Sequence, residues 1–476
     1  MIFTQDLTAV TSSSNPRAST RLDVADAFAI AHPRVISNAP TLTPAPTTGL
    51  TNGVSSHLNA LNPDHALNPD DALAIIPEAA RNCWMLDPAV TFLNHGSYGA
   101  MPRSTAALQS RLRDRMEREP IRFFKHDLEG LVDAARTSLA GILNCRPNDL
   151  APISNATHAL NTILANTPLR AGDEILISDH EYQSLLNELD RVCQRTGATV
   201  VEAKVPFPIV SAEVIVENFL AAITPRTRIV FISHITSASS LIFPVALIIK
   251  ECNARGIDVV LDGAHSPGQI PVDLAALSPS YFVGSGHKWL CGPKGIGFLF
   301  VRADKQPGFR PLALSSRANK VRPERSLFLR DFDYSGTGDY SAFLALPESI
   351  AVVGSLLPGS WPALFRHNHA LALKARDIIC NTLGIASSCP DSMVGTMISI
   401  PIPDAPESLD SRPSKYDDAL QDILIETHGF ATPVWRLNCN EQRIVRVSAQ
   451  VYNTLDQYQR YANVLKAELA KEASAH

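Results

Sequence analysis

The sequence predicts an α/β fold, in which helices cover both faces of a mostly parallel sheet. Between residues 157 and 261, segments with helical periodicity alternate with short runs of aliphatic and β-branched residues. Such alternation is typical of a parallel sheet that is buried on both faces. Polar residues follow several of the apolar runs, where the sheet would present its strand ends. The chain of 476 residues is 45% hydrophobic and 19% charged, which allows an ample core.

The N-terminal segment, residues 1–78, differs in composition from the rest of the chain. It is rich in Ser, Thr, Pro, Asn and Ala, and the sequence at 60–65 nearly repeats at 66–71. This composition cannot bury enough apolar surface to fold alone. We therefore expect a low-complexity, disordered arm, and the acidic residues Asp6 and Asp23 argue against a transit peptide.

Ordered structure is expected from residue 79 onward. Residues 79–99 form a segment that joins the small domain, with a strand at 90–93 that runs into Asn94–Gly99. The two glycines of that run indicate unusual backbone torsions or a close approach to a bound group. Helical periodicity follows at 104–119 and 128–143.

The large domain is expected to span residues 100–340. Its helices are predicted at 157–164, 183–196, 211–223 and 245–255, and its strands at 174–178, 199–204, 228–233, 258–261, 281–283 and 297–301. A smaller C-terminal α+β domain is expected at 341–476. It has predicted helices at 344–356 and 364–383, strands at 394–400 and 443–449, and a closing helix.

Composition excludes several classes of function. The net charge of −5, with no long basic run, gives no footprint for nucleic acid. No apolar run is long enough to span a membrane, and the longest candidate, 241–249, contains Pro244. The eight cysteines form no CxxC pair, so we expect no metal site and no disulfide scaffold. A reducing, cytoplasmic location is the expected one.

Two of the strand ends carry residues suited to binding an anion or a flat ring. Asn155, Ala156 and Thr157 open a helix, whose free N–H groups favour an anion such as phosphate, although an ordinary helix cap has the same pattern. The run 178–182, SDHEY, offers rings that could stack on a cofactor, or it forms a simple turn. The polar pair Ser233-His234 ends another strand, where a solvated loop is the alternative.

Asp262 and Lys288 are the strongest candidates for chemistry. Asp262 follows a buried strand, where a carboxylate is costly unless it has a cationic partner such as a protonated pyridine nitrogen. Lys288 lies between the strands at 281–283 and 297–301. A lysine at such a strand end loses hydration, so its amine is more easily deprotonated and can attack a carbonyl carbon. A lone lysine in a surface loop is the alternative.

The run Asp262 to His265, followed by Ser285 to Lys288, resembles the class V aminotransferase family. These are fold-type I enzymes that depend on pyridoxal 5′-phosphate (PLP), and the isopenicillin N epimerase-like subfamily is the most similar. The resemblance covers about residues 80–470, through FLNHGSYG, SNATHALN, DHEYQSLLNEL, DGAHSPGQIPVDL, GHKWLCGPKG, DYSGTGD and RVSAQVYNT. Each motif alone is weak, whereas their joint occurrence in this order is highly specific. It implies a PLP domain with a seven-stranded-type sheet and a smaller C-terminal domain.

The resemblance assigns cofactor roles to several residues. Lys288 would bind the cofactor aldehyde covalently, Asp262 would pair with the pyridinium nitrogen, and His265 would lie against the ring near its phenolic oxygen. The groups implied to hold the phosphate belong to Ala156, Thr157, Ser285 and His287.

Further roles concern the ring face and a partner subunit. Tyr182 would stack on the ring, with His180 as the alternative, because cysteine desulfurase relatives use the residue that corresponds to His180. Thr337, in the motif SGTG, matches a residue that reaches the phosphate of a partner subunit, which implies a homodimer.

The resemblance also implies how an amino-acid substrate is bound. Arg446 matches the arginine that clamps the substrate α-carboxylate, a task suited to its bidentate guanidinium. Asn94 and His95 resemble residues of the substrate pocket.

The sequence departs from the family pattern in two respects. Cysteine desulfurases carry a nucleophilic cysteine shortly before the carboxylate-binding arginine, but residues 431–435 contain none and Cys439 lies too close to Arg446. A persulfide mechanism is therefore disfavoured. Epimerase-like relatives also differ at 314–317 and at Ser285-Gly286, so the substrate identity cannot be transferred.

The leading interpretation is an epimerase or racemase that acts on an amino acid or an amino-acid-derived small molecule. Lys288 would remove the α-proton, and Tyr182 or a bound water would return one from the opposite face. The alternative is a C–S lyase or a β/γ-replacement enzyme that uses the same carbanion, and an aminotransferase is less favoured. A non-enzymatic binding protein is disfavoured because both Lys288 and Asp262 are present.

Overall fold

A computed structural model describes residues 73, 74, 76–406, 414–416 and 418–474. Most of the predicted N-terminal arm, residues 1–72 and 75, lies outside the described residues. None of the helices in the described part of the chain is long and apolar enough to cross a membrane.

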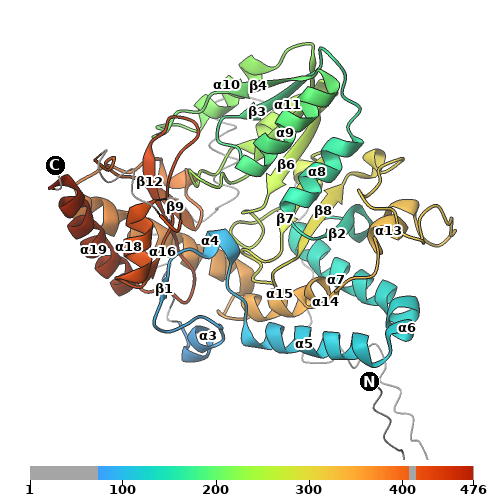
Figure 1. Cartoon of the computed structure of the whole chain (residues 1–476), viewed down its shortest axis with the longest axis horizontal. Helices are drawn as coiled ribbons and strands as arrows, with labels where there is room; N and C mark the ends of the chain where they lie inside the picture. Colours follow the sequence, from blue (N-terminus) through green and yellow to red (C-terminus); the bar gives the residue numbers. More distant parts are fainter. Residues whose placement is uncertain (1–72, 75, 407–413, 417, 475–476) are drawn as a thin grey trace, which may run out of the picture. The chain divides into compact units, whose positions relative to one another are not determined.

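The central feature is a seven-stranded sheet with the order β2-β8-β7-β6-β5-β3-β4 (Figure 1). The strands from β7 to β4 run parallel to one another, and β8 is antiparallel to both of its neighbours. The strand bounds are β2 Leu150–Ile153, β3 Glu174–Ser178, β4 Thr199–Ala203, β5 Thr227–Ser233, β6 Asp258–Gly263, β7 Tyr281–Ser285 and β8 Gly297–Val301. The predicted α/β class and the mostly parallel sheet are therefore confirmed.

The sheet is buried on both faces, which explains why its strands are continuous apolar runs. In β5, Ile229 and Phe231 belong to one hydrophobic cluster, while Val230 and Ile232 on the opposite face are also fully buried. The first cluster also takes in side chains of α8 Ala156–Asn166, α9 Gln183–Thr196 and α13 Leu327–Phe332. In agreement with the predicted alternation of helices and strands, α10 Glu213–Ala222 contacts β4 and α11 Val245–Ala254 contacts β6.

Further helices precede β2, lie between β6 and β7, or follow β8 along the chain. They are α3 Glu78–Asn82, α4 His95–Tyr98, α5 Arg103–Arg118, α6 Pro120–Arg122, a π-helical turn at Phe123–Asp127, α7 Leu128–Leu143, α12 Leu274–Leu277, α14 Ser341–Leu344 and α15 Leu346–Gly354. The helix predicted at 344–356 corresponds to α15, and the short helix α14 precedes it. Pro347 lies in the first turn of α15, where its missing N–H group costs no intrahelical hydrogen bond.

A second, three-stranded antiparallel sheet has the order β11-β12-β9. Its strands are β11 Val434–Arg436, β12 Arg443–Ser448 and β9 Met397–Pro401, and they pack with α16 Ser360–Leu383, α18 Ala419–Glu426 and α19 Leu455–Ala473 around a separate hydrophobic cluster. Figure 1 shows these elements together at the left. A capping box between Thr454 and Gln457 fixes the start of α19.

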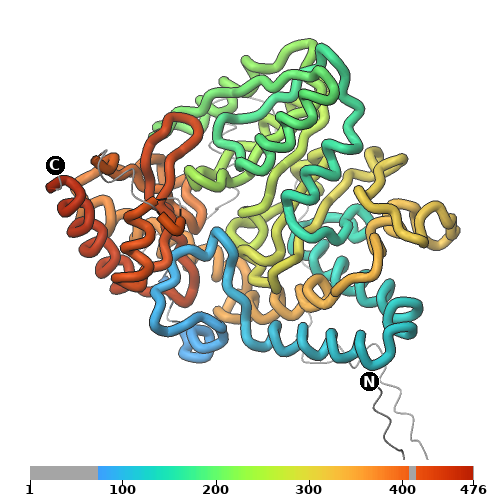
Figure 2. Tube along the Cα trace, viewed as in Figure 1, coloured from blue at the N-terminus to red at the C-terminus, as the bar shows by residue number. Residues whose placement is uncertain are grey.

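The segment before α5 is tied to this second sheet region. Its strand β1 Thr91–Phe92 pairs in parallel with β10 Phe430–Ala431. Figure 2 shows this segment, in blue, beside the red C-terminal elements. The described residues cluster as part of one compact unit, so the predicted division between 100–340 and 341–476 stays a prediction.

Candidate active site

A cavity of about 160 Å³ lies at the carboxyl ends of β5, β6 and β7, beside the start of α8. The carboxyl ends of parallel strands meet at one edge of a sheet, which is where α/β proteins bind ligands. Eight of the predicted site residues line the cavity: Ala156, Thr157, Tyr182, Asp262, His265, Ser285, His287 and Lys288. The structure therefore brings together residues that are separated by more than a hundred positions in the sequence.

Lys288 extends its amine into this cavity, where Nζ lies 3.0 Å from Nε2 of His265. Burial lowers the pKa of Lys288 from its usual 10.5 to about 7, and the positive charge of Arg446 acts in the same direction. The carboxylate of Asp262 opposes this shift. Near neutral pH a large fraction of the amine is thus unprotonated and able to act as a nucleophile or a base.

Asp262, one residue before the end of β6, is 7% exposed and lines the cavity. One carboxylate oxygen accepts a hydrogen bond of 2.8 Å from the Ala264 amide. Burial raises the pKa of Asp262 above its ordinary value. A cation placed against this buried carboxylate would restore the charged form, as a pyridinium nitrogen does.

His265, whose Nε2 atom contacts the Lys288 amine, is nearly fully buried. Burial, reinforced by the charge of Lys288, lowers its pKa well below 6.5, so the imidazole is neutral. Its Nδ1 atom has no hydrogen-bond partner among the described residues, which leaves one polar atom available to a ligand.

The start of α8 forms an anion-binding end of the cavity. The Asn155 side chain caps the His158 amide at 2.8 Å, while the amides of Ala156 and Thr157, being in the first turn, have no intrahelical acceptor. A Cβ atom at Gly297 would lie 2.8 Å from the Cα of Asn155, so only glycine lets β8 approach this turn. The predicted phosphate site thus has free donors.

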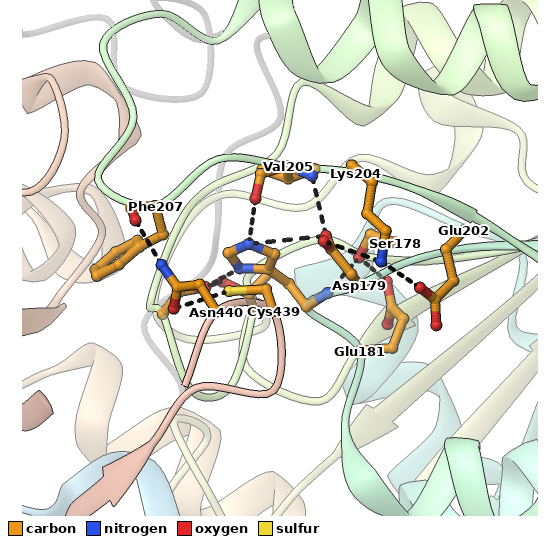
Figure 3. Close-up of polar contacts among 12 residues, drawn as sticks. Ser178, Asp179, Glu181, Glu202, Lys204, Val205, Phe207, Cys439 and Asn440 are labelled. Atoms are coloured by element: carbon orange, nitrogen blue, oxygen red, sulfur yellow. Dashed lines mark hydrogen bonds and ion pairs between the residues drawn. The ribbon is translucent and has the colours of Figure 1, made fainter. Parts of the chain in front are cut away.

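The structure separates the two alternatives for ring stacking. Tyr182 is 51% exposed and lines the cavity. His180 is instead buried away from it, with Nδ1 2.6 Å from Ser239 Oγ and Nε2 2.9 Å from the Val205 carbonyl. Figure 3 shows the surroundings, where the Val205 amide also donates to the carboxylate of Asp179. Of the two, only Tyr182 lines the cavity, and its stacking on a ring stays a prediction.

Asn94 and His95 lie behind the cavity wall and do not line it. Asn94 Oδ1 accepts hydrogen bonds from Ser97 Oγ at 2.6 Å and from Arg446 at 3.1 Å. His95 is fully buried and touches the backbone of Lys288. The predicted contact of these two residues with substrate therefore gains no support from their placement.

Arg446 projects from β12 toward the same region and is 1% exposed. Its guanidinium donates to the Ser237 carbonyl at 2.7 Å and to Ser97 Oγ at 2.7 Å, and lies 4.6 Å from the centre of the Trp435 ring. Burial lowers the pKa of Arg446 to about 10, so it stays charged at neutral pH. Ser97 and Ser237 line the cavity, which places the charge directly behind its wall.

Thr337 lies in an exposed turn outside the cavity of its own chain. Its Oγ1 atom is 2.9 Å from the Tyr334 hydroxyl. Its predicted contact with a partner subunit stays a prediction.

The sequence pattern did not point to Glu181, whose carboxylate contacts the cavity-lining residue Ser233. This carboxyl group is 3% exposed and accepts hydrogen bonds from Ser178 Oγ at 2.8 Å, from Ser233 Oγ at 2.6 Å and from the Ser233 amide at 3.1 Å. Burial raises its pKa to about 7, and the charge of Asp262 contributes. Figure 3 shows Glu181 beside Ser178. The sequence does offer one signal for Glu181, which is an acidic residue between the rings of His180 and Tyr182, shortly after the end of β3.

Glu181 should make the protein less stable as the pH rises from about 4.5 to 7. Between these values the unfolded chain has released the proton that the folded carboxyl keeps, so the free energy of unfolding falls with pH, by up to about 3 kcal/mol in total. In Glu181→Gln this slope should flatten. Urea unfolding at several pH values measures it, with Glu188→Gln, another buried acid, as the control. An unchanged slope in Glu181→Gln would contradict the assignment.

The residues of the cavity fit PLP. An amine, a buried carboxylate, free helix amides and an exposed tyrosine ring match the aldehyde, the pyridine nitrogen, the phosphate and the ring face of that cofactor. The unpartnered Nδ1 of His265 and the open first turn of α8 are sites that a polar ligand would satisfy.

Comparison with known proteins supports the same view. The family model for aminotransferase class-V matches residues 118–460. The chain is 35% identical over 406 residues to isopenicillin N epimerase of Amycolatopsis lactamdurans, covering 82% of this chain and 98% of that protein. It is 27% identical to a probable chloroplastic L-cysteine desulfhydrase of Arabidopsis thaliana, covering 80% and 83%.

The fold is also similar to that of a solved structure, a C-DES variant with glycine covalently linked to the PLP cofactor. The TM-score is 0.64 at 20% identity, and the match covers 80% of this chain and 96% of that chain.

Proposed function

The chain belongs to the class-V aminotransferase family and is a PLP-dependent enzyme, and from this premise we propose that it inverts the α-carbon of an amino-acid substrate. When bound, PLP supplies an electron sink that lowers the cost of removing the α-proton. The observation that carries the proposal is the Lys288 amine, which is held in the cavity with a pKa of about 7. A base whose pKa lies near the working pH is partly unprotonated there and still binds a proton well enough to remove it from a substrate.

The other residues of the cavity have distinct tasks in this proposal. The negative charge of Asp262 would stabilise a protonated pyridine nitrogen in the bound cofactor. The N–H groups in the first turn of α8 would bind its phosphate. Arg446, which Ser97 and Ser237 hold in place, attracts the α-carboxylate and so orients the α-hydrogen toward Lys288. On the opposite face, Tyr182 or a bound water returns the proton.

A C–S lyase is the second candidate, favoured by the similarity to a probable L-cysteine desulfhydrase. Removal of the same α-proton by Lys288 would then be followed by loss of the β-substituent instead of reprotonation. No cysteine is among the cavity-lining residues that the structure describes. A mechanism with a nucleophilic cysteine is therefore not proposed for either activity.

The test is incubation of the purified enzyme with a panel of L- and D-amino acids and dipeptide-like compounds in deuterated water. The proposal predicts deuterium at the α-carbon of both enantiomers or epimers, with recovery of the intact side chain. Release of pyruvate, ammonia or sulfide, without inverted product, would favour the lyase and reject the epimerase.

We also propose a homodimer and a cytoplasmic location. Thr337 is exposed and outside the cavity of its own chain, where it is available to a partner subunit, as the family resemblance implies. All eight cysteines are free, as expected of a reducing compartment. Sedimentation equilibrium checks the first part of this proposal.

A further inference from the structure

The turn that carries Lys288 is held from behind by a chain of buried aromatic residues. His95 in α4 is 0% exposed, and its Nε2 atom lies 3.1 Å from the backbone carbonyl of Lys288. Its other ring nitrogen, Nδ1, lies 2.8 Å from the hydroxyl of Tyr452, a residue beyond β12. Three segments that are far apart in the sequence thus meet directly behind the reactive lysine.

The hydrogen atoms of this contact can be assigned from the chemistry of the groups. Burial lowers the pKa of His95 to about 3, so the ring is neutral and carries one N–H. A backbone carbonyl only accepts, so the N–H must be at Nε2 and must donate to Lys288. Nδ1 is then an acceptor, and the Tyr452 hydroxyl, whose pKa burial raises well above 10, donates to it. The Lys288 carbonyl therefore fixes the tautomer of His95, and the Tyr452 hydroxyl completes the chain by donating to the other ring nitrogen.

The packing around this pair leaves little freedom. The His95 ring lies 4.8 Å from the Trp289 ring, and Trp84 packs edge-on against Tyr452 at 5.2 Å. The carbonyl of Lys288 also accepts from the Cys291 amide at 3.0 Å, which closes the turn. A Cβ atom at Gly99 would lie 2.0 Å from the His287 carbonyl oxygen, so the loop after α4 is pressed against the same turn.

We propose that His95 and Tyr452 are positioning residues, which fix the backbone of Lys288 and thereby aim its amine into the cavity. Neither residue is among those that line the cavity, and both act through the carbonyl of Lys288. Reactive groups need placement to within a fraction of an ångström, so a loosened backbone costs rate more than binding. The inference rests on the proposed role of Lys288, but it can be tested without any substrate.

The test compares Tyr452→Phe with Tyr458→Phe in the purified enzyme. Both changes remove one hydroxyl from a tyrosine close to the end of β12, but the Tyr458 hydroxyl donates to the Ser448 carbonyl at 2.9 Å and not to His95. The readouts are the amide of Cys291 and the amide of Gly292, which donates to the Gly286 carbonyl at 2.8 Å in the same turn. In Tyr452→Phe, hydrogen exchange at both amides should become about tenfold faster. With a substrate, kcat should fall about tenfold while KM changes less than about twofold. Tyr458→Phe should leave both measurements unchanged.

A second comparison shows whether Tyr452 acts through His95. In a His95→Gln background, the further change Tyr452→Phe should no longer alter exchange at Cys291 and Gly292. Equal exchange in the two tyrosine variants, or an undiminished effect of Tyr452→Phe in the His95→Gln background, would overturn the proposal. Because exchange needs no turnover, its result stays separate from the failure or success of the epimerase assignment.

Discussion

Lys288→Ala is expected to lower turnover by at least about 10³-fold and to remove the visible absorption of the lysine-linked cofactor. One amine has two tasks in this account, since it attaches the cofactor and it removes the α-proton, and each task alone is worth about 10²–10⁴-fold. The low pKa of Lys288, near 7, reflects its burial in the cavity wall. Steady-state kinetics and an absorption spectrum of the purified variant measure both effects.

The matched control for this variant is Lys305→Ala. Lys305 lies outside the cavity and forms an ion pair with Asp258 at 2.6 Å, at the opposite end of β6. We expect this control to keep its absorption band and its activity. A Lys288→Ala enzyme that turned over at the rate of the control would reject the assignment of the site as a whole.

Asp262→Asn should lower kcat by about 10²–10³-fold, which is the usual loss when a preorganised charge partner is removed from a buried site. Asparagine has the same shape, but it cannot balance a positive charge at the pyridine nitrogen. Lys288 is intact in this variant, so the cofactor should remain covalently bound while catalysis fails. Kinetics and the absorption spectrum, taken together, separate these two effects.

Asp258→Asn is the control for this second variant, because it changes the same type of residue in the same strand, at its far end. It should keep nearly full activity. If Asp262→Asn were as active as Asp258→Asn, the carboxylate would have no part in the reaction.

The strands and the central site could be predicted because both follow from local patterns. The apolar runs of β6 and β7 are buried on both faces, so their bounds are marked by the polar residues that follow. Parallel pairing then puts Asp262 level with Val283, two residues before the end of β7. The meeting of Asp262 with Lys288 is a consequence of this register.

Strand β2 could not be predicted in the same way. Pro152 interrupts its run of Leu150–Ile153, and a proline argues against a central strand. The structure places β2 at the edge of the sheet, where only one side of a strand pairs with a neighbour and the missing N–H of a proline is tolerated. Whether a strand lies at the edge depends on the order of all strands in the sheet, so the four residues of β2 do not reveal it.

The sequence also did not predict the directions in which individual side chains point. In the run 178–182, His180 turns toward Val205 while Tyr182 turns toward the cavity, and Glu181 turns toward β5. These choices depend on the turn after β3 and on contacts with β5, which lies 50 residues away. The motif around His95 likewise does not report on which side of Lys288 its imidazole lies.

The most direct test of the account is the chemical identity of the cofactor attachment site. Purified enzyme is treated with sodium borohydride, which makes the link between an amine and the cofactor aldehyde permanent, and its peptides are then sequenced by mass spectrometry. The account predicts the mass of reduced PLP on Lys288 and on no other lysine. Attachment at a different lysine, or the absence of any attached cofactor in an enzyme saturated with PLP, would contradict it.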